Sequence, residues 1–290
     1  MRYLHRKTPL IMLNIIMSYL RNKNVYKFSP KDMFMHFYSS GVKLPKVYEV
    51  TKKNNYFLLK IGDEQLYWPS KFSYIDLPWL YSEIFDNFNL NPHSYNFPSI
   101  DFENINWAID GGACEGFFSI FAQNANINKI IAIEPISELK DSLVETFNNF
   151  YPDREFKVIL GALGEKEEKL NISFSANNIA ESKFTDNTNN TREVDVYTLD
   201  KIFNMEDIKD GSGIIKMDIE GAEMDALKGA VNVMKKYKPI LLVAVYHSYM
   251  NAIECRDIIK QANPEYKIEF RGIHSYYKNE PGRPMMLYAY

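Results

Sequence analysis

The segment at residues 107–121, WAIDGGACEGFFSIF, constrains the fold more than any other part of this sequence. An apolar run of strand length ends in Asp110 and two glycines, and an apolar run of helical length follows. Glycines at such a turn let the backbone approach a ligand closely, as in nucleotide-binding α/β domains. The turn therefore predicts one of two ligands: a dinucleotide, or the single nucleoside of S-adenosylmethionine.

Strand-like and helix-like segments alternate along the rest of the chain, which is typical of a parallel sheet with helices on both faces. The predicted strands are residues 106–111, 129–135, 156–163, 213–221 and 240–247, then a final antiparallel pair at 266–273 and 284–290. The predicted helices are residues 116–125, 136–150, 222–237 and 249–262. The Asn-rich run at residues 175–191 is expected to be an exposed loop.

The first 60 residues are strongly basic, with 12 Lys or Arg against 2 Asp or Glu, whereas the remaining residues have 22 and 35. A basic arm on an acidic body suggests contact with an anionic partner such as phospholipid head groups, an acidic glycan or nucleic acid. Nucleic acid is the least expected of these. The alternative is a solvated basic surface that docks on the acidic body.

Residues 1–100 are predicted to form an accessory region before a main domain at residues 101–290. Residues 9–20 are apolar, but they are too short and too interrupted by Asn14 and Ser18 to span a bilayer. We expect a buried or oligomer-forming helix there, with an interfacial membrane helix as the alternative. The segments expected after it are a hairpin at 56–69, a helix at 77–88 and a linker rich in Pro, Asn and Ser at 91–106.

The two cysteines, Cys114 and Cys255, are too few for a disulfide framework. Their number fits a reducing compartment, so we expect a cytoplasmic protein that is either free or peripheral to a membrane. No CxxC or Cys/His cluster suggests zinc.

Asp110 and Glu134 decide between the two ligands. Starting at Gly111, the turn reads Gly-x-Ala-x-x-Gly, an imperfect match to the dinucleotide pattern. Asp110 is poorly placed beside a pyrophosphate, but a carboxylate there can hold the methionine ammonium of S-adenosylmethionine, directly or through water.

Glu134 ends the next strand and is placed to accept both ribose hydroxyls, although NAD enzymes have an acid at a similar separation. The alternative is that Glu134 is only a carboxylate at a helix N-terminus, before Pro135, with no role in ligand binding. Together the two acids favour S-adenosylmethionine.

Several segments resemble FkbM-type methyltransferases: DGGACEG, IEP, GALGE, VDVYTLD and, most specifically, IIKMDIEGAEMDALKGA. The resemblance covers about residues 105–250. It implies a class I methyltransferase-like, Rossmann-like α/β fold with a seven-stranded, mostly parallel sheet. Members of this family typically methylate hydroxyl groups of sugars and natural products. Cys114 is a departure, since many methyltransferases have glycine there, although the family tolerates other residues.

The resemblance also implies the contacts with the cofactor. Asp110, Gly112 and Gly116 would line the methionine side, and Glu134 would bind the ribose. The GAL turn at Gly161–Leu163 would lie against the adenine. The full set of predicted cofactor-binding residues is Asp110, Gly111, Gly112, Ala113, Cys114, Gly116, Glu134, Pro135, Gly161, Ala162 and Leu163.

The KMDIEGAE block places three carboxylates at the expected carboxyl end of a buried strand, where open α/β sheets bind ligands. Asp218 and Glu220 point the same way in an extended segment, because side chains alternate. Glu223 falls in the first helical turn, where the helix dipole is a sufficient explanation. The interpretations are an acceptor-binding site, a general base, a cation site or an ion pair with Lys216, and we assign no metal ligands.

His247 follows the last parallel strand and is expected at the same sheet edge. Its ordinary pKa near neutrality suits a base for a hydroxyl. A lone histidine is more often structural, but the position beside a carboxylate cluster favours a catalytic role equally. We therefore predict Asp218, His247 and Glu220 as catalytic residues.

The predicted protein is an S-adenosylmethionine-dependent O-methyltransferase. Its expected acceptor is a small-molecule or glycan hydroxyl, above all on a sugar of a cell-surface glycan. One alternative is a nicotinamide-dependent oxidoreductase on a similar sheet. The other is a non-catalytic, methyltransferase-like subunit of a membrane-associated glycan assembly. The apolar helix leaves homo-oligomer formation open.

Overall fold

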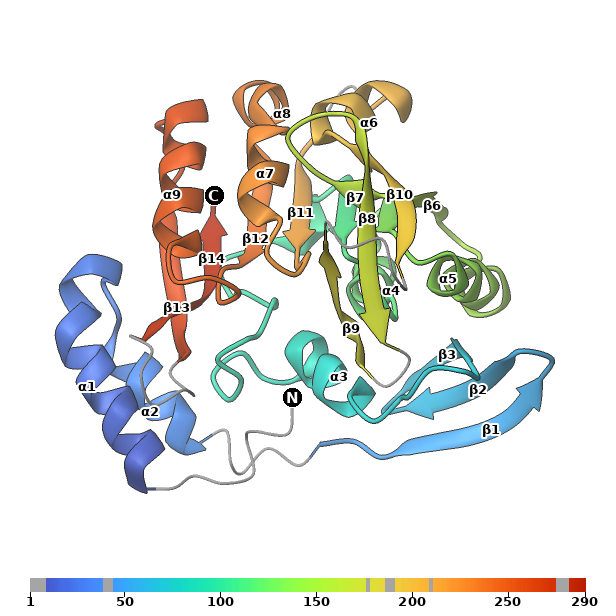
Figure 1. Cartoon of the computed structure of the whole chain (residues 1–290), viewed down its shortest axis with the longest axis horizontal. Helices are drawn as coiled ribbons and strands as arrows, with labels where there is room; N and C mark the ends of the chain where they lie inside the picture. Colours follow the sequence, from blue (N-terminus) through green and yellow to red (C-terminus); the bar gives the residue numbers. More distant parts are fainter. Residues whose placement is uncertain (1–8, 39–43, 176–177, 186–190, 209–210, 275–281) are drawn as a thin grey trace.

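The structure is a computed structural model that describes residues 9–38, 44–175, 178–185, 191–208, 211–274 and 282–290. Its centre is a seven-stranded sheet in the order β13-β14-β12-β11-β4-β5-β6 (Figure 1). The strands are β4 (Trp107–Gly111), β5 (Lys129–Glu134), β6 (Glu155–Leu160), β11 (Gly213–Met217), β12 (Ile240–Ala244), β13 (Ile268–His274) and β14 (Arg283–Ala289). β14 runs antiparallel to both neighbours, and the other pairs are parallel. The predicted mostly parallel α/β sheet is confirmed.

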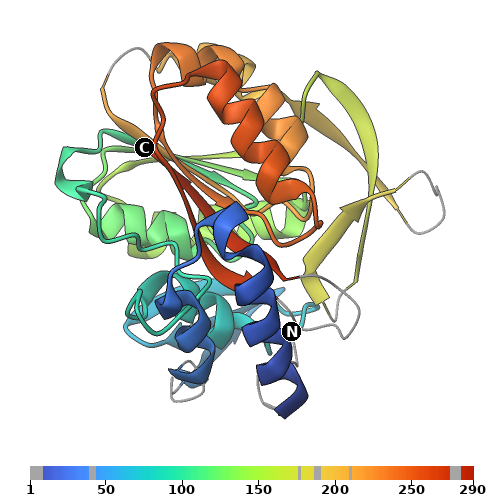
Figure 2. The same cartoon turned by 90° about the vertical axis from the view of Figure 1, so that its left-hand side faces the viewer.

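Helices cover both faces of this sheet, and alternate residues of each strand point to opposite faces. Figure 2 shows α7–α9 on one side of the sheet and α4–α5 on the other. In β4, for example, Ala108 packs with α4 and α5, whereas Trp107 and Ile109 pack with the helices of the opposite face. These helices are α4 (Phe117–Asn124), α5 (Ser137–Phe150), α6 (Leu199–Met205), α7 (Glu223–Lys228), α8 (Val231–Lys236) and α9 (Asn251–Ala262). Burial on both faces explains why the central strands are almost entirely apolar.

The helix predicted at residues 222–237 is in fact two helices, α7 and α8, which meet at Gly229. A Cβ atom at Gly229 would lie 2.2 Å from the carbonyl oxygen of Gly164. The chain therefore passes too close to a neighbouring loop for a side chain, and the break occurs at this contact.

A three-stranded sheet, β1-β2-β3, lies beside the main domain and packs on α5. Its strands are β1 (Val47–Lys53), β2 (Tyr56–Ile61) and β3 (Glu64–Pro69), so the predicted hairpin with Gly62 and Asp63 in its turn is confirmed. The backbone N–H of Tyr67 donates to the Thr146 hydroxyl of α5 at 2.9 Å, which fixes the hairpin on the main domain.

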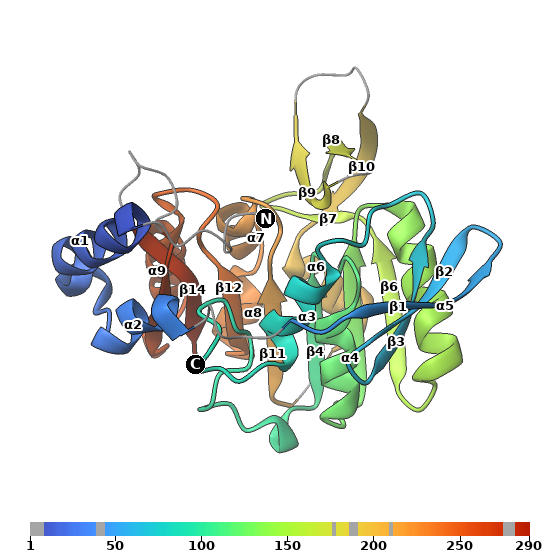
Figure 3. The same ribbon diagram turned by 90° about the horizontal axis from the view of Figure 1, so that it is seen from below.

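A second small sheet, in the order β7-β10-β8-β9, corrects the prediction of an exposed loop at residues 175–191. Its strands are β7 (Ala162–Leu163), β8 (Glu168–Ser175), β9 (Asn178–Phe184) and β10 (Arg192–Tyr197). Figure 3 shows β8, β9 and β10 projecting from the rest of the molecule. β9 pairs antiparallel with the preceding strand β8, and this backbone pairing overrides a polar sequence with no apolar alternation. The rest of the predicted loop, apart from its edges, lies outside the described residues.

Helices α1 (Pro9–Tyr26) and α2 (Pro30–Tyr38) pack beside β13, far from the β1-β2-β3 sheet (Figure 1). Ile15 is buried, whereas Leu13, Met17 and Leu20 are 39–54% exposed. The amide of Asn22 also donates to the Gly282 carbonyl at 3.0 Å. The predicted apolar helix therefore exists, docked through one face only. Within the described residues, no helix has both the length and the apolar character needed to cross a membrane.

Residues between α3 (Leu77–Phe85) and β4 lack long regular elements, apart from a short 3₁₀ turn at Phe102–Asn104. Yet His93 and Tyr95 in this predicted linker are almost completely buried. They contact the main domain, and Tyr95 shares a hydrophobic cluster with residues of the large sheet. The division of the chain at residue 100 stays a prediction.

Candidate active site

The glycine turn after β4 passes directly against the end of β11. Gly112 has φ +71°, and a Cβ atom there would lie 2.0 Å from the carbonyl oxygen of Asp218. Gly116 has φ +86°, and a Cβ atom would lie 2.5 Å from the side chain of Leu143. Only glycine fits these two positions without displacing the backbone or the helix that supports it. The chain can make this turn because glycines occupy the positions where the ends of β4 and β11 meet.

A pocket with an empty volume of about 630 Å³ opens at the carboxyl ends of β4, β5 and β11. Fifteen residues line it: Gly112, Cys114, Ile133, Glu134, Pro135, Ile136, Leu139, Gly161, Ala162, Leu163, Ile172, Asp218, Ile219, Glu220 and Ala222. Its lining of carboxylates, glycines and apolar side chains is that of a site for a small molecule or cofactor. We call it the first pocket.

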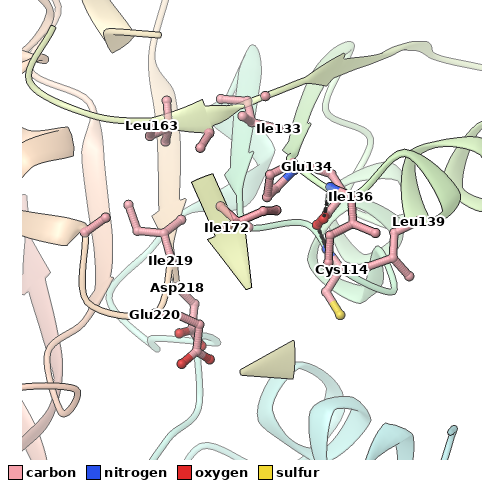
Figure 4. Close-up of a pocket in the computed structure, with 15 residues that line it drawn as sticks. Cys114, Ile133, Glu134, Ile136, Leu139, Leu163, Ile172, Asp218, Ile219 and Glu220 are labelled. Carbon is pink, nitrogen blue, oxygen red and sulfur yellow. Dashed lines mark hydrogen bonds between the residues drawn. The ribbon is translucent and has the colours of Figure 1, made fainter. Parts of the chain in front are cut away.

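Glu134 is fixed at one side of the first pocket (Figure 4). One carboxylate oxygen accepts the backbone N–H of Cys114 at 2.9 Å, and the other accepts the backbone N–H of Ile136 at 2.8 Å. Burial raises the pKa of Glu134 to about 7, although these hydrogen bonds oppose the shift. Each oxygen of a carboxylate can accept a second hydrogen bond. Both oxygens of Glu134 can therefore accept a further hydrogen bond, and its contact with ribose hydroxyls stays a prediction.

Apolar side chains form the remainder of the first pocket. Ile133, Ile136 and Leu139 come from β5 and α5, and Leu163 comes from β7. Ile172 reaches in from β8, so the small sheet contributes one wall (Figure 4). The sequence analysis identified Leu163 but not the other four, because an apolar residue that lines a pocket does not differ from a core residue in its local pattern. Together they form an apolar surface suited to a flat aromatic ring beside the carboxylate.

Asp110 is completely buried beneath the glycine turn and lines neither pocket. Its carboxylate lies 3.1 Å from the ammonium of Lys216 and accepts the hydroxyl of Ser119 at 2.8 Å. Lys216 also donates to the carbonyls of Gly111 and Gly112. This placement gives Asp110 a role in holding the turn, and its predicted contact with a methionine ammonium stays a prediction. The ion pair considered for Lys216 is therefore made with Asp110.

A second pocket of about 560 Å³ meets the first at four shared residues, Gly112, Cys114, Asp218 and Glu220. The other residues of its wall come from the glycine turn and α4, from β11 and the segment after β12, and from the accessory region: Leu80, Glu83, Ile84, Tyr95, Ala113, Glu115, Phe118, Lys216 and Tyr246. Residues 80–95 therefore complete a cavity that the main domain alone leaves open. Nothing in their local sequence indicated this role.

Asp218, Glu220 and His247 lie together, as the sequence analysis predicted. The His247 Nε2 atom is 3.4 Å from an Asp218 oxygen and 3.5 Å from a Glu220 oxygen. Figure 4 shows the Asp218 and Glu220 carboxylates side by side at the strand end. Glu220 has φ +56°, an uncommon value for a non-glycine residue and one that tends to occur at functional sites.

Glu223 lies on the Nδ1 side of the His247 imidazole. One Glu223 oxygen lies 3.0 Å from His247 Nδ1 and accepts the backbone N–H groups of Ile219 and Gly221. The other oxygen accepts the amide of Asn251 at 3.1 Å. Glu223 is completely buried, so it does more than favour the helix dipole: it holds the turn through two backbone N–H groups and lies within ion-pair distance of the imidazole.

A second histidine, which the sequence analysis missed, approaches Asp218 from the accessory region. His93 Nδ1 is 2.7 Å from a Glu83 oxygen, and His93 Nε2 is 4.0 Å from an Asp218 oxygen. The Tyr95 hydroxyl donates to that same Asp218 oxygen at 2.7 Å. Asp218 therefore lies between two histidine–carboxylate pairs, one from each part of the chain.

The charges of this cluster follow from its packing. Burial alone would lower the pKa of His247, but Glu223, Glu220 and Asp218 outweigh it and raise that pKa well above the ordinary value. Burial alone would raise the pKa of Asp218, but the histidines and Lys216 hold it below its ordinary value. The carboxylates around His247 therefore favour its protonated form over the neutral imidazole that a base requires.

The predicted site residues fall into four groups. Those that line the first pocket are Gly112, Cys114, Glu134, Pro135, Gly161, Ala162, Leu163, Asp218 and Glu220. Ala113 lines the second pocket only. Asp110, Gly111 and Gly116 lie beneath the turn, and His247 supports Asp218 from outside both linings.

Comparison with known proteins agrees with this architecture. The family model described as "Methyltransferase FkbM domain" matches residues 110–268, more than half of the chain. No curated protein sequence matches this chain.

Among solved structures, the methyltransferase FkbM from Methylobacillus flagellatus KT is similar with a TM-score of 0.54 and 16% identity, over 96% of this chain and 61% of that one. The tRNA (uracil-54, C5)-methyltransferase of Pyrococcus abyssi, solved with S-adenosyl-L-homocysteine, gives 0.38 and 9%, over 81% and 44%. The chain thus spans about three fifths of the Methylobacillus protein. The resemblance noted in the sequence is confirmed, and the chain belongs to the FkbM methyltransferase family.

Proposed function

We propose that this protein transfers a methyl group from S-adenosylmethionine to a hydroxyl oxygen. The observation that carries the proposal is that two pockets meet at Asp218 and Glu220. The first is lined by a carboxylate and apolar side chains, which suits a nucleoside, and the second has several polar and charged side chains. A methyl donor in the first pocket and an acceptor in the second would meet at that junction. Membership of the FkbM family supports methyl transfer as the reaction.

The first pocket fits the nucleoside part of the cofactor. Glu134 would accept the two ribose hydroxyls, since both of its oxygens are already oriented by backbone donors. The apolar wall of Leu163 and Ile172 would hold the adenine, and Gly112 would let the methionine portion pass toward the junction. The carboxylates there favour the positive sulfonium electrostatically.

The second pocket fits a hydroxylated acceptor. Bound S-adenosylmethionine supplies an electrophilic methyl group, so the protein has only to place the acceptor oxygen in line with it and to receive a proton. Asp218, held by Tyr95 and by the two histidines, would orient the acceptor hydroxyl. Glu220 lines both pockets and would take the proton. Tyr95 and Tyr246 offer aromatic faces, which suits a sugar.

Calorimetry with S-adenosylhomocysteine and with NAD⁺ tests this proposal. We expect S-adenosylhomocysteine to bind with one site per chain and NAD⁺ not to bind. The first pocket has one carboxylate placed for a ribose, and the charged residues of its described lining are all acidic, which disfavours a pyrophosphate. Binding of NAD⁺ alone would support the oxidoreductase alternative instead. Failure of both ligands to bind the folded protein would support the non-catalytic alternative.

We further propose that the exposed side of α1 binds an anionic membrane surface. Leu13, Met17 and Leu20 recur at helical spacing on that side, and Ile15 on the opposite side is buried against the protein. The exposed basic residues of this part of the chain are Arg21, Lys23, Lys27 and Lys31. Apolar side chains beside cations are the arrangement that binds acidic lipid head groups and the adjoining acyl chains.

The triple substitution of Leu13, Met17 and Leu20 by serine should reduce sedimentation of the full chain with vesicles of phosphatidylcholine and phosphatidylglycerol. Added salt should weaken binding of the unchanged protein, since the basic residues contribute electrostatically. Vesicles of phosphatidylcholine alone serve as the control. The membrane proposal is wrong if the unchanged protein does not bind anionic vesicles and the substitution converts a dimer into a monomer. In that case the exposed side of α1 binds a second copy of the chain.

A further inference from the structure

Glu115 is an acid of the second pocket that the proposed reaction does not use. It follows Cys114 in the glycine turn and lines the second pocket but not the first. Among the described residues, no Lys, Arg or His lies within ion-pair distance of its carboxylate, which contacts only neutral groups, the Cys114 thiol and its own backbone. Burial raises the pKa of Glu115 to about 7, because the charge of Lys216 offsets burial only in part. A cation beside Glu115 would therefore stabilise its ionised form.

The pocket as a whole has an excess of negative charge. Four of the five charged residues that line it are acidic, and Lys216 is the exception. Each of these residues except Glu115 has an acidic or basic partner within 3.5 Å: Lys216 with Asp110, Glu83 with His93, and Asp218 and Glu220 with His247. The basic side chains around the pocket are thus already shared among the other acids, and none of them is left for Glu115.

At Asp218, by contrast, the pocket lacks a hydrogen-bonding group. Within the described part of the chain, one Asp218 oxygen has no hydrogen-bond partner. The same is true of His93 Nε2, which belongs to a side chain only 1% exposed and lies 4.0 Å from the other Asp218 oxygen. Buried polar atoms without partners are rare, because each costs free energy on burial. A ligand hydroxyl, which can both donate and accept, would supply the partner that Asp218 lacks.

We propose that Glu115 binds a protonated amino group of the acceptor, so that the acceptor is an amino alcohol, such as a sugar with a free amino group. The inference rests on the proposed function, because it takes the second pocket as the acceptor site. The hydroxyl to be methylated would lie at Asp218 and Glu220, with the ammonium at Glu115. Tyr95 and Tyr246 belong to the same wall, and tyrosine rings favour a cation beside them.

The ion pair also favours transfer to oxygen. A carboxylate stabilises the protonated form of an amine, and an ammonium has no lone pair with which to attack a methyl group. The hydroxyl oxygen would attack the methyl carbon, the carbon–sulfur bond would break, and the hydroxyl proton would pass to Glu220. The sulfonium would become the neutral thioether of S-adenosylhomocysteine.

Paired acceptors test this inference. The full chain is assayed with ethanolamine, glucosamine, galactosamine and mannosamine, each beside its N-acetyl derivative, and kcat/KM is obtained from release of S-adenosylhomocysteine. We expect methylation of free amines, with kcat/KM at least about tenfold above that of the N-acetyl derivative, because a charge-assisted hydrogen bond contributes at least that factor. Nuclear magnetic resonance of the product should place the methyl group on oxygen. Methylation of none of the free amines, or on their nitrogen, would overturn the inference.

Glu115→Gln retains the shape of the side chain and removes its charge. It should lower kcat/KM for the free amines by at least about tenfold and leave the N-acetyl derivatives and S-adenosylhomocysteine affinity nearly unchanged. Glu103→Gln, at an exposed acid before β4, is the control. If Glu115→Gln instead lowers S-adenosylhomocysteine affinity and leaves the preference for free amines unchanged, Glu115 contacts the methionine ammonium of the cofactor and the inference is wrong.

Failure of this inference differs from failure of the proposed function. If neutral hydroxylated compounds are methylated as well as free amines, the amine contact is refuted, and methyl transfer to a hydroxyl stands. If calorimetry shows that the unchanged protein does not bind S-adenosylhomocysteine, the proposed function is refuted, and the inference with it.

Discussion

Replacing Glu134 by alanine should lower the affinity for S-adenosylhomocysteine by tenfold or more. The substitution removes two charge-assisted hydrogen bonds to the ribose, and a hydrogen bond to a charged group contributes about 1.5–3 kcal/mol. Isothermal titration calorimetry gives the affinity, and circular dichroism confirms the fold. The control is Glu155→Ala, which removes an exposed acid from the neighbouring strand. Unchanged affinity in a folded Glu134→Ala protein would refute the ribose contact.

The same carboxylate should make cofactor affinity depend on pH. Burial raises the pKa of Glu134 to about 7, so the free carboxyl is protonated below that pH and ionised above it. The ionised form accepts both ribose hydroxyls, so affinity should be full above pH 7 and fall as the pH decreases, approaching tenfold per unit. Glu134→Gln should remove this dependence. Glu115→Gln should retain it, because Glu115, whose pKa burial also raises to about 7, lines only the second pocket.

Local sequence patterns were sufficient for the large sheet and for the glycines and carboxylates that line the first pocket. The strands are apolar throughout because both faces of the sheet are covered, and glycines occur where the chain passes close to a neighbouring strand end. Since parallel strands all end at one sheet edge, the sequence placed both Glu134 and Asp218 at that edge. These inferences need no knowledge of long-range packing.

The second pocket could not be predicted, because it depends on how the accessory region packs. His93 and Tyr95 belong to a segment rich in Pro, Asn and Ser, and its local pattern is that of an exposed connection. They become site residues only because α3 and the segment after it pack against the sheet edge. The same reason applies to β9, whose strand conformation comes from pairing with β8 and not from its own composition.

Replacing Glu220 by glutamine should lower turnover by a factor of about 10²–10⁴, the usual contribution of a general base, and leave S-adenosylhomocysteine affinity nearly unchanged. Glu220 lines both pockets, and Tyr95 occupies an oxygen of its neighbour Asp218, so Glu220 is the carboxylate better placed to receive the acceptor proton. Turnover is measured as release of S-adenosylhomocysteine with a panel of hydroxylated acceptors. Glu165→Gln, at an exposed ion pair with Lys228, is the control.

Three outcomes separate the roles of the neighbouring side chains. If Glu220→Gln keeps near-normal turnover while His247→Ala loses it, the imidazole is the base in spite of its carboxylate neighbours. If Asp218→Asn alone abolishes turnover with cofactor affinity intact, Asp218 both orients the acceptor and takes its proton. If Asp218→Asn chiefly destabilises the protein, its contacts with Tyr95 and the two histidines are structural. If only Glu220→Gln loses turnover, Glu220 is the residue that receives the proton. It lines both pockets, as Asp218 does, but the Tyr95 hydroxyl donates to Asp218 and not to Glu220.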